Sequence, residues 1–189
     1  LDSFNGYHMG VTAENIAKKF NITREQQDLF SIGSQEKTQK AISEKKFKNE
    51  IIIIRNNKND IILEQDEHPR KNINLTDLKK LKTVFKPNGT VTPGNSSGIN
   101  DGASATIIMS GKEAERRSIK PLAKIISWAS CGVEPSLMGL GPIQAVNLAL
   151  KKASWRIEEV DLFELNEAFA AQSIAVVNEL KIPKAKLNV

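Results

Sequence analysis

The sequence predicts a mixed α/β protein, and three features of its 189 residues support that fold class. Strand-length apolar runs alternate with helix-period segments from residue 103 onward. Before that point, a long helical segment precedes two β-branched runs that flank a polar turn. The one cysteine excludes disulfide scaffolds and cysteine-rich zinc sites, and no apolar run approaches the roughly 18 residues that span a bilayer. We therefore expect one or two domains, no metal site and no membrane contact.

Two helices are expected at the start of the chain. The first covers Thr12–Lys19, where the residues have a helical pattern. Thr23 and Gln26 have the spacing of a capping box, in which the hydroxyl and the amide each satisfy a free backbone N–H group. A second, long helix should therefore run from this box to about Lys46.

A hairpin, a short helix and a loop should follow. Ile51–Ile54 and Ile61–Leu63 are β-branched runs separated by polar residues, which predicts two paired strands. Thr76–Leu81 has a weak helical pattern. Pro87–Gly102 is so rich in Gly, Pro, Asn and Ser that it predicts a loop.

Three strands and a surface helix are expected in the second half. Ala105–Met109 has the composition of a buried strand, and Leu122–Ala129 and Val160–Leu165 predict two more. The charged segment Lys112–Arg117 between the first two predicts a surface helix. Alternating strands and helices of this kind favour an α/β arrangement.

Two further helices complete the prediction. Pro142 can open a helix because its missing N–H group costs nothing in the first turn, and this helix presents one apolar face of Ile143, Val146, Leu150 and Ala153. Asn166 can cap the last helix. That helix repeats Phe169, Ser173, Val176 and Leu180, and its other faces are rich in Ala and Val. We expect it to be buried nearly all round.

The positive charge is concentrated in one segment. Residues 36–86 contain 13 basic and 8 acidic residues, a surplus of five that equals the net charge of the whole chain. Such a segment favours a polyanionic partner, either nucleic acid or a small molecule with several phosphates. A solvated lysine-rich surface is the alternative.

Three loops are candidate ligand sites. Residues 94–102 hold three glycines among Ser and Asn, which allows close backbone approach and offers polar groups. Gly139-Leu140-Gly141-Pro142 is a poor dinucleotide motif, since proline removes a phosphate donor. Asn166–Phe169 lies where a strand is expected to meet a helix, so a side-chain amide there can face developing negative charge.

Four motifs of the chain resemble those of thiolases in order and spacing. They are His8-Met9-Gly10 with Thr12-Ala13-Glu14-Asn15, residues 90–102, Met138-Gly139 with Gly141-Pro142, and Asn166-Glu167-Ala168-Phe169-Ala170. The resemblance covers nearly the whole chain. Within the family it points to acetyl-CoA acetyltransferases of the cytosolic type, through Ser127-Trp128 and residues 132–138.

The resemblance implies a thiolase-like α/β fold of two similar βαβαβαββ halves, with an inserted α+β loop domain that grips coenzyme A. Residues 1–111 would be the remainder of the N-terminal domain, with the loop domain over about residues 1–90. Residues 112–189 would be the first part of the C-terminal domain. The basic segment 36–86 would then attract the phosphates of coenzyme A.

The implied activity is that of an acetyl-CoA C-acetyltransferase, which condenses two acetyl-CoA molecules to acetoacetyl-CoA and coenzyme A and catalyses the reverse. In the family one cysteine carries the acyl group and another removes a proton from the acetyl methyl group. Cys131 stands at neither motif, and both cysteines and the Gly-His-Pro histidine would lie outside residues 1–189. We therefore expect an internal thiolase segment that is inactive alone, with Cys131 a packed side chain.

The resemblance also implies the site residues. Asn166 would hold the water of an oxyanion hole for the thioester enolate, and its alternative role is that of a helix cap. The residues implied to contact coenzyme A or substrate are His8, Met9, Arg70, Phe85, Ser97, Gly98, Met138, Ala168 and Phe169. Each has a structural alternative in a turn, the core or a surface ion pair. Asp77 stands where serine is common and is excluded, because an acid beside phosphates is unfavourable.

Coenzyme A thioesters would be substrates, and no separate cofactor is expected. The implied partners are acetyl-CoA, coenzyme A and, for the full-length protein, further copies in a homodimer or homotetramer. The implied location is the cytoplasm, with mitochondria as the alternative. Two other functions stay open, an inactive coenzyme A-binding homologue and a thiolase for longer 3-ketoacyl chains. A nucleic-acid module is disfavoured, since residues 36–86 offer only Phe47 and Phe85 as aromatic platforms.

Overall fold

The computed structural model describes residues 1–189, and most of its regular structure is helical. The helices are α1 (Met9–Lys19), α2 (Arg24–Ser43), α3 (Leu75–Lys79), α4 (Gly111–Arg116), α5 (Gly141–Ala153) and α6 (Ala170–Leu180), with 3₁₀ turns η1 (Pro135–Leu140), η2 (Ile157–Glu159) and η3 (Lys184–Lys186). The single sheet pairs β1 (Ile54–Arg55) with β2 (Ile61–Leu63). None of the helices is long and apolar enough to cross a bilayer.

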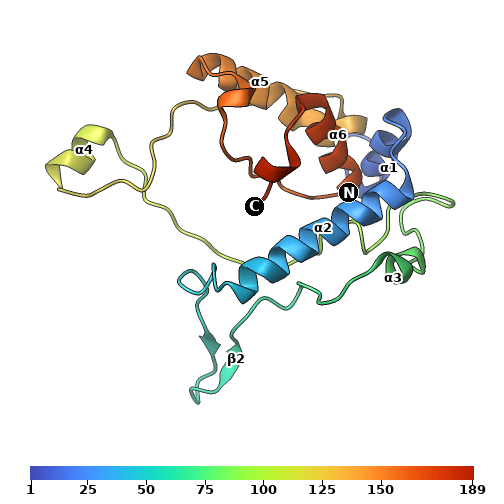
Figure 1. Cartoon of the computed structure of the whole chain (residues 1–189), viewed down its shortest axis with the longest axis horizontal. Helices are drawn as coiled ribbons and strands as arrows, with labels where there is room; N and C mark the ends of the chain where they lie inside the picture. The colour runs from blue at the N-terminus through green and yellow to red at the C-terminus, as the bar shows by residue number, and fades with distance from the viewer.

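Helix α6 is the centre of the packed region, with α1, α2 and α5 around it (Figure 1). Its Ala171 and Ala175 pack against Ile16, Ala17 and Ile22, where small side chains allow close approach of α1. The opposite side of α6 belongs to a second cluster, formed by Val176, Leu180, Ile182 and Leu187. Seven of the 11 residues of α6 are buried, which confirms the prediction of a nearly all-round buried helix.

The helix starts follow from local hydrogen bonds. Thr23 and Gln26 form the predicted capping box at the start of α2, with N–H···O distances of 3.2 and 2.8 Å. Pro142 lies in the first turn of α5, as predicted. α1 begins at Met9, three residues before the predicted start, because the His8 side chain caps it by accepting a hydrogen bond from the Gly10 N–H group.

The prediction that Asn166 caps the last helix is wrong. α6 begins at Ala170, and Phe169 occupies its cap position without a side-chain hydrogen bond. α2 also ends at Ser43, before the predicted Lys46, while α3 and α4 lie within two residues of their predicted positions. Residues 87–102 form the predicted loop.

The three strands predicted in the second half are not formed. Residues 105–109 and 122–129 belong to no sheet, and their side chains are exposed, with Ile107 89% and Leu122 106% accessible. In residues 160–165, only Phe163 forms a bridge, with Leu187. An apolar run shows strand propensity, but a strand also needs a neighbour for its N–H and C=O groups. No other segment of the chain supplies one for residues 105–109 and 122–129.

The hairpin is formed but is shorter than predicted. Ile54 pairs with Leu63 and Arg55 with Ile61, whereas residues 51–53 stay outside the ladder. It projects from the packed region beyond the end of α2, and α4 stands apart on two extended segments (Figure 1).

A buried carboxylate, that of Asp28, links α2 to the loop at residues 90–98. Asp28 has a fully buried side chain that accepts a hydrogen bond from Arg24 Nε at 2.8 Å. Its other oxygen accepts one from Asn95 Nδ2 at 3.0 Å, and Asn95 is itself buried. A buried carboxylate is tolerated when its oxygens are paired in this way. Removing it leaves a buried amide and a partly buried guanidinium without their partner.

We expect Asp28→Ala to lower the free energy of unfolding by about 3 kcal/mol or more, because it breaks this buried pair. The matched control is Glu25→Ala on the same helix, whose carboxylate pairs with Lys79 at 3.3 Å while both side chains are 57% exposed. This control should cost no more than about 1 kcal/mol. Urea unfolding measures both losses of stability, in the protein as its native gene encodes it. Equal losses in the two variants would contradict the role given to Asp28.

Candidate functional site

The loop at residues 90–98 begins at the buried carboxylate of Glu14. Glu14 accepts hydrogen bonds from the backbone N–H groups of Thr90 and Val91, at 2.7 and 2.8 Å, and from the Thr90 hydroxyl at 3.0 Å. These donors satisfy a charge that is only 6% exposed. A side chain on Gly89 would overlap the same carboxylate, with a Cβ position 2.2 Å from Oε1. Glycine is therefore required there.

The same loop is joined to the start of α6. The Ala170 N–H group donates to the carbonyl of Asn95 at 2.9 Å, and the Ser97 N–H group donates to the carbonyl of Ala168 at 3.0 Å. Ser96 and Phe169 form an antiparallel bridge between these two contacts. Two of the candidate loops identified in the sequence, residues 94–102 and 166–169, therefore lie side by side.

Three aromatic rings extend the site toward α1. The His8 ring stacks on Phe85 with a centroid distance of 4.4 Å and an interplanar angle of 22°. Phe85 meets Phe169 edge to face at 6.2 Å. Phe85 can pack this closely on α1 because residue 10 is glycine, whose Cβ position lies 2.2 Å from the Phe85 ring. His8 caps α1 through Nδ1 as acceptor, so the geometry assigns the ring proton of a neutral His8 to Nε2.

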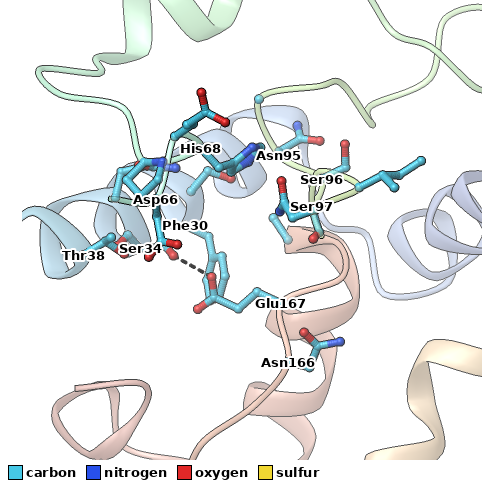
Figure 2. A pocket seen from close by; sticks show the side chains of 18 of the residues that line it. Phe30, Ser34, Thr38, Asp66, His68, Asn95, Ser96, Ser97, Asn166 and Glu167 are labelled. Carbon is cyan, nitrogen blue, oxygen red and sulfur yellow. Dashed lines mark hydrogen bonds between the residues drawn. The ribbon is translucent and has the colours of Figure 1, made fainter. Parts of the chain in front are cut away.

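A cleft of about 630 Å³ lies on the other side of the 94–98 loop (Figure 2). Its walls come from α2, residues 66–69, residues 94–101 and residues 166–170, and they are mostly hydroxyl, amide and carboxylate groups. Ser97 and Asn166 are the predicted site residues that line it. The cleft has acidic side chains at Asp66, Glu67, Asp101 and Glu167, and no Lys or Arg lines it. It therefore does not suit a polyphosphate.

Asn166 is exposed and its side chain has no hydrogen bond to the chain. Its neighbour Glu167 is firmly held, accepting from the Ser34 hydroxyl at 2.6 Å and from Asn188 Nδ2 at 2.7 Å. An amide that is free of protein partners can donate to a water or a ligand oxygen. The structure thus leaves Asn166 available for the oxyanion role and removes its alternative as a helix cap.

The remaining predicted residues lie around this centre. Met9 is 38% exposed in the first turn of α1. Met138 is half-buried in η1, beside Gly139, whose Cβ position meets Gln172 and Ile16. Gly98 lies against His68, and the exposed Arg70 follows the cleft residue Pro69, with its backbone N–H group bonded to Gln35 at 2.9 Å. The predicted roles of these residues stay predictions.

Asp77 is engaged locally on α3. Its carboxylate accepts hydrogen bonds from Lys80 Nζ at 2.9 Å and from Asn74 Nδ2 at 2.7 Å. These contacts, that of Lys80 foremost, lower the pKa of Asp77 below its ordinary value. Lys80 offsets the negative charge that led us to exclude Asp77.

The residues whose hydrogen bonds fix the position of the site loops were not predicted to have that role. They are Glu14, Asp28, Asn95, Glu167 and Asn188, and each acts through a contact with a residue distant in sequence. The sequence offers a signal for one of them, the i,i+4 spacing of Arg24 and Asp28 on a predicted helix.

Family models match nearly the whole chain. The model described as thiolase, N-terminal domain, matches residues 1–112, and the one described as thiolase, C-terminal domain, matches residues 119–189. An acetyl-CoA acetyltransferase of Syntrophomonas wolfei is 52% identical over 193 residues, which cover 99% of this chain and 48% of that protein. The cytosolic acetyl-CoA acetyltransferase of Mus musculus is 48% identical over 192 residues, covering all of this chain and 48% of its own length.

Solved structures give the same result for the fold. The crystal structure of the Bacillus anthracis acetyl-CoA acetyltransferase matches 99% of this chain and 48% of its own, with a TM-score of 0.93 and 40% identity. Human mitochondrial 3-ketoacyl-CoA thiolase in complex with CoA matches 96% and 45%, with a TM-score of 0.90 and 41% identity. The chain spans about half the length of the curated relatives it matches.

The close contact between Gly10 and the Phe85 ring gives a test of the packing of the aromatic cluster on α1. We expect Gly10→Ala to lower the free energy of unfolding by about 1–3 kcal/mol, because the new methyl group overlaps the Phe85 ring. The control is Gly33→Ala in α2, where nothing lies within 4 Å of the added Cβ. It should stabilise the protein by about 0.5–1 kcal/mol through helix propensity. A Gly10→Ala protein as stable as Gly33→Ala would show that Phe85 does not pack on α1.

Proposed function

Since this chain belongs to the thiolase family and has the predicted thiolase-like α/β fold, we propose that the protein that carries it is an acetyl-CoA C-acetyltransferase. It condenses two molecules of acetyl-CoA to acetoacetyl-CoA and free coenzyme A, and it catalyses the reverse thiolysis. Relatives that are 47–52% identical over essentially the whole chain carry the name acetyl-CoA acetyltransferase, which supports this choice of substrate.

The observation that carries the proposal is the unpartnered amide of Asn166 beside the joined loops 94–98 and 166–170. Condensation requires that a proton leave the acetyl methyl group and that the thioester oxygen accept the resulting negative charge. Asn166 donates to a water on that oxygen, a contact that contributes on the order of 3 kcal/mol in a dry site. Cys131 does not line the cleft, and the proposal assigns the acyl-carrying role to a cysteine outside residues 1–189.

The pantetheine and nucleotide of coenzyme A lie on the aromatic side of the loop rather than in the acidic cleft, and the thioester end reaches the exposed side chain of Asn166. The rings of His8 and Phe85, which stack, and of Phe169, which meets Phe85 edge to face, offer an apolar surface to pantetheine. Ala168 precedes Phe169 and is bonded to Ser97, and Met138 is proposed to contact the same substrate. The phosphates face the basic segment 36–86, which includes Arg70. The thioesters are substrates, and the reaction needs no further cofactor.

The protein acts in the cytoplasm as a homodimer or homotetramer. The cytosolic mouse and rat relatives support this location, and a mitochondrial thiolase among the structural neighbours keeps mitochondria as the alternative. The exposed apolar side chains of Ile107, Leu122 and Trp128 support burial of this region in the assembled protein.

Asn166→Asp tests the chemistry directly. The substitution keeps the size of the side chain, but it places a carboxylate where the enolate charge develops. We expect the rate of acetoacetyl-CoA thiolysis to fall by about 10²-fold or more, with little change in KM or in melting temperature. The substitution is made in the protein as its native gene encodes it. The control is Asn178→Asp, the same change at an exposed position of α6, which should behave as wild type. Unchanged turnover in Asn166→Asp would remove Asn166 from the reaction.

A further inference from the structure

We propose that Glu167 and Asn188 are positioning residues that aim the Asn166 side chain, an inference that rests on the proposed function of Asn166. Asn166 makes no hydrogen bond of its own to the chain. A donor that stabilises an enolate must nevertheless hold its position to within about 0.5 Å. The required geometry therefore comes from the residues on either side of it.

Glu167 anchors the residue after Asn166 to helix α2. Its two carboxylate oxygens accept separate hydrogen bonds, from the Ser34 hydroxyl at 2.6 Å and from Asn188 Nδ2 at 2.7 Å. Figure 2 shows the Ser34 and Glu167 side chains facing each other, with Asn166 directed to the other side of the chain. Residues 164–167 form no helical turn. Holding Glu167 against α2 therefore fixes the side of the chain from which Asn166 projects.

Asn188 anchors the residue before Asn166. Its Oδ1 accepts from the Leu165 N–H group at 2.8 Å, and its Nδ2 donates to the Leu165 carbonyl at 2.9 Å as well as to Glu167. One amide thus holds the backbone on one side of Asn166 and the side chain on the other. Asn188 has a φ of 46°, in the left-handed region that asparagine tolerates better than most residues. Lys37 of α2 adds a hydrogen bond to the carbonyl of Leu187 at 2.6 Å.

Glu167→Ala in the native-gene protein tests the inference. We expect kcat for thiolysis to fall by about 10- to 100-fold while KM stays within about threefold, since the coenzyme A surface is untouched. Glu167→Gln should restore most of the rate, because the amide can accept from Asn188 and donate to Ser34. Glu164→Ala is the control, an exposed carboxylate three residues nearer the N-terminus than Glu167, and should leave kcat unchanged.

The double variant decides whether Glu167 acts through Asn166. In an Asn166→Ala background, Glu167→Ala should cause no further loss of kcat. Losses that multiply would overturn the inference, as would a Glu167→Ala protein that melts earlier but keeps its kcat. If Glu167→Ala does not fold, Ser34→Ala and Asn188→Gly replace it, each expected to lower kcat by about threefold or more. Wild-type kcat in both would also overturn it. Full activity of Asn166→Ala alone would instead refute the proposed role of Asn166, and this inference with it.

Discussion

Asn95 joins α2, the loop at residues 90–98 and α6 through five hydrogen bonds, and the candidate site depends on that junction. Its amide nitrogen donates to Asp28 and to the carbonyl of Thr90, and its amide oxygen accepts from the Thr92 N–H group. Its backbone bonds to Thr92 and to Ala170. Residue 95 thus connects a segment near the start of the chain with one near its end, and the neighbouring Ser96 and Ser97 are placed against residues 168 and 169.

Two buried carboxylates make this junction specific. Glu14 and Asp28 come from different helices; Glu14 accepts hydrogen bonds from Thr90 and Val91 of the loop, and Asp28 accepts one from Asn95 of the loop and one from Arg24 of its own helix. Buried charges tolerate few alternative arrangements, since any other loop conformation leaves a carboxylate without donors in a region closed to water. The loop therefore has one favourable position. A site on such a loop is already arranged before ligand arrives, which is what the stabilisation of a developing charge requires.

Much of the local structure could be predicted from the sequence, because caps and periodicity depend on near neighbours. The capping box of Thr23, the helix opened by Pro142 and the loop at residues 87–102 are examples. The strands at 105–109 and 122–129 could not, since pairing depends on a partner that an apolar run does not specify. The motif predicts Asn166 as a site residue. The hydrogen bonds that hold its neighbours, however, involve Ser34 and Asn188, which are distant in sequence. Local pattern carries no information about such contacts.

The central claim is that α1, the 94–98 loop and the start of α6 form one surface that contacts coenzyme A. Amide hydrogen exchange of the native-gene protein, measured with and without coenzyme A, tests it most directly. The claim predicts that exchange slows together at Gly10, Ser97 and Ala170, whose N–H groups bond to His8, Ala168 and Asn95. Exchange in α4 should not change. Slowing confined to α4, or no slowing at those three amides when coenzyme A saturates the protein, would contradict the claim.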